Sequence, residues 1–141
     1  MRALRAGVAY FALVFALGFA FGTVRTLLLA RFPEIGRFAA VLVELPFLLT
    51  ASWLICHHVI RRLAVPDTLR ARAITGAVAF ALLMLAEAVL DALLAGATLA
   101  GHFAQYLEPS HALGLAGQVA FGLMPLIAGS DAGHSRNRPS R

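Results

Sequence analysis

The stretch Ile74–Leu99 reads ITGAVAFALLMLAEAVLDALLAGATL, and it decides what kind of protein this is. It is long enough to cross a bilayer as one helix, which needs about 20 mainly apolar residues. Its charged residues are Glu87 and Asp91, which lie one helical turn apart. A carboxylate at membrane depth is costly and needs a partner, a proton or a bound ion. The stretch therefore predicts a transmembrane helix that carries a polar site.

The composition of the whole chain is that of a membrane protein. Of its 141 residues, 60% are hydrophobic and 13% are charged, whereas a soluble domain of this size needs far more polar surface. We predict one all-α, polytopic membrane domain over residues 1–129 and a disordered cytoplasmic tail at 130–141. Connections that contain proline or glycine divide the domain into four spans, which we place at about 6–30, 38–60, 73–100 and 112–128.

The arginines indicate how the spans are oriented. All twelve basic residues are Arg, which is typical of a GC-rich bacterial genome. Nine of them lie before the first span, between the second and third spans, or after the fourth; the other three are Arg25, Arg31 and Arg37. The positive-inside rule then places both termini in the cytoplasm. We predict an antiparallel four-transmembrane-helix bundle, N-in/C-in, in a bacterial inner membrane. The net charge of +5 follows from this topology, so no nucleic-acid partner is expected.

Polar side chains in different predicted spans fall at similar depths. In an antiparallel hairpin, residues equidistant from the turn lie level with each other. Taking the first two breaks as the turns, Arg25, Glu44 and Glu87 share one depth in the outer half of the membrane. Asp91 and Gln118 are expected about one turn further out. We predict that these side chains line one pocket as ligand-binding or ion-binding residues: Arg25, Glu44, Glu87, Asp91 and Gln118.

One arginine facing three carboxylates leaves an excess of negative charge, which a proton or a cation can neutralise. Glu87 and Asp91 point in the same direction and can share that charge. The hypothesis that follows is a small transporter that binds or carries a proton, a cation or a cationic small molecule. The alternative is a non-catalytic scaffold or accessory subunit, whose buried charges only fix helix packing.

Other kinds of site have weaker support in the sequence. There is no nucleophile with a matching base and no phosphate-binding loop, so no catalytic residue is predicted, and an enzyme acting on lipid at the outer leaflet is the most distant hypothesis. Cys56 is the single cysteine, which excludes a thiolate metal centre. His102, Glu108 and His111, alone or with Asp91, could hold a divalent metal at the outer mouth, but their spacing matches no metal signature, and we expect the three loop residues to face solvent. No metal and no cofactor is predicted.

Small residues at helical spacing, such as Gly18 and Gly22, favour close helix packing. The expected partners are therefore the lipid bilayer and, through such surfaces, a second copy of the chain or a larger membrane complex.

One spaced set of residues extends over most of the chain: Arg25, Glu44-Leu45-Pro46, Ser52-Trp53, Arg61-Arg62, Val65-Pro66, Ala79-Phe80, Glu87, Gln118, Phe121 and Pro125. With this pattern the chain resembles uncharacterised small four-span bacterial integral membrane proteins. The resemblance implies the same four-span fold, and it brings no activity or cofactor with it. The chain does not resemble the small multidrug exporters, whose essential acid lies in the first span, or the dual-topology fluoride channels.

Overall fold

The computed structural model describes residues 1–96 and 98–128, and all the regular structure in these ranges is helical. Four of the helices are long and apolar enough to cross a membrane, as in a multi-pass membrane protein. The predicted all-α class with four span-length helices is therefore confirmed. The elements are α1 (Arg2–Arg31), η1 (Pro33–Ile35), α2 (Arg37–Arg62), α3 (Leu69–Ala95), α4 (Leu99–Ala104), η2 (Gln105–Leu107) and α5 (Pro109–Ile127). The tail predicted at 130–141 lies outside the described residues.

Turn residues separate the first three long helices. Pro33 begins the short 3₁₀ turn η1, and Gly36 ends it with a φ of 71°, a conformation that glycine adopts without steric cost. Pro66 follows α2 and cannot continue a helix. Thr68 then caps α3, because its hydroxyl accepts a hydrogen bond from the Ala71 N–H at 3.2 Å.

The third long helix begins and ends earlier in the chain than predicted. We expected a single span over 73–100, but α3 ends at Ala95 because Gly96 takes up the left-handed conformation, with a φ of 63°. Thr98 then starts a separate short helix, α4, by accepting a hydrogen bond from the Gly101 N–H at 3.1 Å. The connection to α5 is therefore a folded helical segment and not a simple loop.

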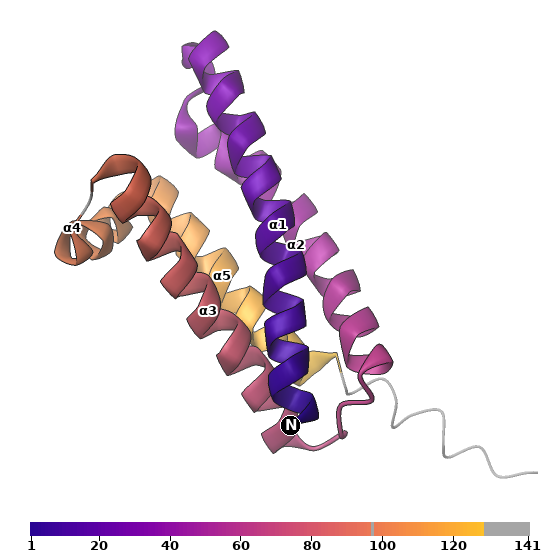
Figure 1. The fold of residues 1–141 in the computed structure, drawn as a ribbon. Coiled ribbons are helices and arrows are strands. Elements are labelled where there is room, and N and C mark those ends of the chain that lie inside the picture. The colour runs from indigo at the N-terminus through magenta and orange to yellow at the C-terminus, as the bar shows by residue number, and fades with distance from the viewer. Residues whose placement is uncertain (97, 129–141) are drawn as a thin grey trace, which may run out of the picture.

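The long helices pack in a ring of contacts. α1 lies against α2 and α3, and α5 lies against α2 and α3. Figure 1 shows the helices close together at the end that holds the N-terminus, while the α1–α2 pair and the α3–α5 pair diverge toward the end that holds η1 and α4. At the N-terminal end, Arg2 Nη1 lies 3.5 Å from the carbonyl oxygen of Ala64. We call these two ends the core end and the cleft end.

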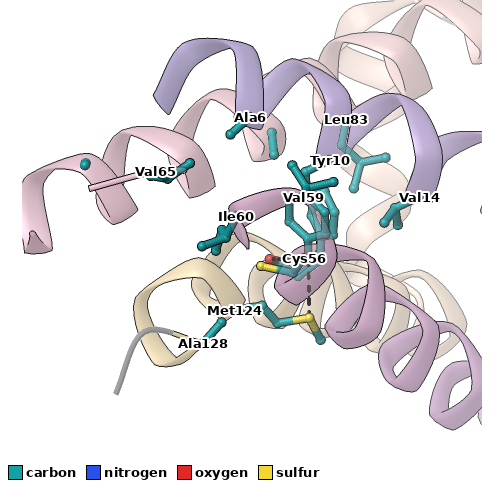
Figure 2. Close-up of a cluster of buried hydrophobic side chains, with 13 residues drawn as sticks. Ala6, Tyr10, Val14, Cys56, Val59, Ile60, Val65, Leu83, Met124 and Ala128 are labelled. Atoms are coloured by element: carbon teal, nitrogen blue, oxygen red, sulfur yellow. Dashed lines mark hydrogen bonds between the residues drawn. The ribbon is translucent and has the colours of Figure 1, made fainter. Parts of the chain in front are cut away.

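The buried hydrophobic cluster lies toward the core end, and side chains of α1, α2, α3 and α5 contribute to it (Figure 2). Tyr10 of α1 is fully buried there. Its hydroxyl donates to the carbonyl oxygen of Phe121 at 3.1 Å and lies 3.3 Å from Met124 Sδ, while its ring stacks on Phe121 with centroids 4.4 Å apart. These contacts fix α1 against α5 and close the bundle at this end.

Glycine brings α3 and α5 into backbone contact near the same cluster. A Cβ added at Gly76 of α3 would collide with the carbonyl oxygen of Gly122 on α5. A Cβ added at Gly122 would lie 3.1 Å from the Cβ of Phe80. The two helices can approach this closely only because neither position carries a side chain.

Candidate functional site

A cleft of about 620 Å³ lies between the long helices at the cleft end. That volume is in the range of pockets that hold small molecules. All the residues predicted to form the polar pocket line it: Arg25, Glu44, Glu87, Asp91 and Gln118. The structure therefore brings together polar side chains from α1, α2, α3 and α5. Whether they bind a ligand stays a prediction.

Arg25 of α1 and Glu44 of α2 form an ion pair across the first hairpin. Arg25 Nη1 lies 2.5 Å from Glu44 Oε2. The Glu44 side chain is 9% exposed and that of Arg25 is 31% exposed. The charge of Glu44 therefore needs its partner for stabilisation more than the charge of Arg25 does, because water can still reach the guanidinium. The two residues are equidistant from the turn around η1, which is the relation that predicted their contact.

Glu87 of α3 is paired with an amide and not with a cation. Gln118 Nε2 on α5 donates a hydrogen bond to Glu87 Oε2 at 2.5 Å. The other end of the same amide, Gln118 Oε1, is buried and has no hydrogen-bond partner among the described residues. An acceptor oxygen without a donor is unusual in a buried site, and here it lies beside a carboxylate.

Gln118 was expected about one turn further out than Glu87, near the level of Asp91, and the structure pairs its amide with Glu87. The prediction counted residues from the centre of a symmetric loop. The actual connection contains α4 and η2, so it is not the symmetric loop that the count assumed.

Asp91 is paired directly with His102, a contact that the sequence suggested only as part of a metal site. His102 of α4 places Nδ1 2.5 Å from Asp91 Oδ2, and its Nε2 lies 3.2 Å from the hydroxyl of Tyr106. His102 is only 5% exposed, so the expectation that it faces solvent is wrong. Burial, together with the negative charges of Glu87 and Asp91, raises the pKa of Tyr106 to about 12. The Tyr106 hydroxyl therefore stays protonated at neutral pH and can donate to this chain of side chains.

The residues considered for a metal site at the outer mouth do not gather into one group. His102 turns inward to Asp91, whereas His111 Nδ1 lies 3.4 Å from Glu108 Oε2, and Arg37 Nη1 lies 3.4 Å from His111 Nε2. Within the part of the chain that the structure describes, no group of three His, Cys, Asp or Glu side chains could hold a metal ion.

Two of the three cleft carboxylates contact a basic side chain. Glu44 has Arg25, and Asp91 has His102. Among the described residues, Glu87 forms no ion pair. It is the cleft carboxylate that contacts neither an arginine nor a histidine.

Comparisons with protein-family models, with curated proteins and with solved structures found no match to this chain. The resemblance to small four-span bacterial membrane proteins therefore stays a prediction, and any function has to be argued from the cleft itself.

Proposed function

We propose that this chain is a multi-pass protein of a bacterial inner membrane that binds a proton or a small cation at Glu87 and carries it across the bilayer. In this proposal the four long helices form an antiparallel bundle with both termini in the cytoplasm. The cleft then opens in the outer half of the membrane. The observation that supports the proposal is a carboxylate without a cationic partner, lining a cleft of about 620 Å³.

The chemistry of the Glu87 site suits a positive ligand. The Glu87 carboxylate offers negative charge, and the buried Gln118 Oε1 offers a second oxygen that has no donor in the described residues. A proton on Glu87 removes the cost of a charge at membrane depth, and a cation or an ammonium group held there would receive oxygen ligands from both side chains. The size of the cleft also admits a cationic small molecule.

The two ends of the protein have different roles in this proposal. The cleft extends past Glu87 to the α4 side and ends in the other direction at Val14, Leu83 and Phe121, which belong to the buried cluster. That cluster, with Tyr10, fills the core end with buried side chains (Figure 2). A permanently open channel does not fit this asymmetry. A carrier fits it, because the core end would have to part before an ion could leave on the cytoplasmic side.

A flux measurement tests the proposal. The full chain is reconstituted in liposomes, a membrane potential is imposed, and proton entry is followed with an internal pH dye. We expect a pH-dependent flux that the Glu87→Gln variant loses, because glutamine keeps the shape of glutamate but cannot ionise. Glu34→Gln makes the same chemical change at an exposed position outside the cleft, and should retain the flux. A Glu87→Gln protein that is folded and conducts like the wild type would contradict the proposal.

One observation favours the scaffold as a second candidate. Each cleft carboxylate bonds to a side chain of another helix: Glu44 to α1, Glu87 to α5 and Asp91 to α4. Such bonds can fix helix register without any ligand. If Glu87→Gln loses its folded structure in circular dichroism, and the wild type carries no flux, the scaffold is supported and the carrier is contradicted.

A further inference from the structure

A second hollow, of about 580 Å³, lies on α2 at the core end, far along the helix from Glu44. Its lining residues are Trp53, Leu54, His57, His58, Arg61 and Arg62. They are spaced by three and four residues, so they share one face of the helix. We call this feature the α2 groove.

The α2 groove gathers positive charge that the protein does not neutralise. Arg61 and Arg62 are both exposed, and neither forms an ion pair within the described residues. Arg72, at the same end, is by contrast buried and lies 3.3 Å from Asp67. Arginines in the last turn of a helix interact favourably with its dipole, but that interaction does not require a tryptophan and two histidines beside them.

In the orientation proposed above, the α2 groove lies where an apolar helix meets the membrane surface. Leu54, on its apolar side, is 64% exposed, and the helix becomes strongly polar from His57 onward. Tryptophan is the residue that favours the headgroup level of a bilayer, and arginine pairs with phosphate through two parallel hydrogen bonds. The groove therefore combines a surface for an acyl chain, an interfacial ring and a phosphate-binding end.

We propose that the α2 groove is a binding site for an anionic phospholipid. Arg61 and Arg62 hold the phosphate, and the part of an acyl chain nearest the headgroup lies along Leu54 and Trp53. In the orientation proposed above, this lipid belongs to the cytoplasmic leaflet. The site stands on different residues from the cleft, so it does not depend on any role of Glu87.

Trp53 gives a local readout, because it is the only tryptophan in the chain. The full chain is reconstituted in vesicles of brominated phosphatidylcholine, which quenches tryptophan fluorescence, and unbrominated phosphatidylglycerol is added in steps. An anionic lipid that prefers the groove displaces the quencher and restores the fluorescence. We expect phosphatidylglycerol to be preferred over phosphatidylcholine by roughly fivefold or more, the attraction expected from one or two arginines at a charged surface. In Arg61→Gln/Arg62→Gln the preference should fall to about one.

A matched double variant distinguishes binding at the α2 groove from a general electrostatic attraction between the protein and anionic lipid. Arg5→Gln/Arg70→Gln removes the same charge from exposed positions that do not line the α2 groove, and it should keep the wild-type preference. Equal losses in the two double variants, or no preference in the wild type, would overturn the proposal. So would a change in Trp53 fluorescence when inorganic phosphate is added to detergent-solubilised protein at the concentration at which phosphatidylglycerol acts, because the groove would then bind free phosphate. All variants change exposed side chains only, and circular dichroism checks that each is folded.

Discussion

Replacing Arg25 by Gln is expected to lower the free energy of unfolding by about 3 kcal/mol. The change leaves the Glu44 carboxylate, which is 9% exposed, without its cation. An unpaired charge on a largely buried side chain is among the most damaging changes in a folded protein. The measurement is reversible unfolding in mixed detergent micelles, followed by circular dichroism.

Replacing the other partner, Glu44, should lower the free energy of unfolding by less. Glu44→Gln leaves an arginine whose side chain is 31% exposed and which can extend toward the membrane surface. The double variant Arg25→Gln/Glu44→Gln removes both charges and should recover most of the stability lost in Arg25→Gln. If the two single variants lose equal stability and the double variant loses their sum, the pair does not act as a unit and this description of the site is wrong.

The Gly76→Ala variant should lose about 3 kcal/mol of stability, the upper part of the usual range for an overpacked contact. The new methyl group would collide with the backbone carbonyl of Gly122, and a backbone cannot rotate away as a side chain can. α3 and α5 would have to separate, which would also disturb the Gln118–Glu87 hydrogen bond that joins them.

Gly114→Ala is the matched control on α5. A Cβ at Gly114 meets nothing within 4 Å, and alanine is a better helix former than glycine by up to about 1 kcal/mol. The control should therefore be as stable as the wild type or slightly more stable, by the same unfolding measurement. A Gly76→Ala protein as stable as Gly114→Ala would show that α3 and α5 do not pack through these glycines.

Much of this fold could be predicted because apolar length and turn residues are properties of single segments. The first hairpin also allowed a prediction of contact between helices, since its turn around η1 is short and Arg25 and Glu44 lie equally far from it. The third connection did not allow this. Gly96 and Thr98 end one helix and start another there, and residue counting from a loop centre no longer gives the register.

The contact between His102 and Asp91 could not be predicted from the sequence either. A histidine in a polar connection is usually solvated, and nothing local in the sequence indicates that α4 turns it toward Asp91. The Thr98 cap was the available signal, because a threonine three residues before a glycine N–H can restart a helix after Gly96. A helix restarted there places His102 on its first turns. Because His102 contacts Asp91, Glu87 is the cleft carboxylate that contacts no basic side chain.

The most direct test of the account is to observe the Glu87 carboxyl group itself. Infrared difference spectra are recorded on the full chain in lipid vesicles as the pH is lowered in steps, and those of Glu87→Gln are subtracted. The account predicts a carboxyl C=O band that appears on acidification in the wild type and in Glu34→Gln and is missing in Glu87→Gln. Identical spectra for the wild type and Glu87→Gln at every pH would mean that Glu87 exchanges no proton with water, and the proposed proton or cation site would not exist.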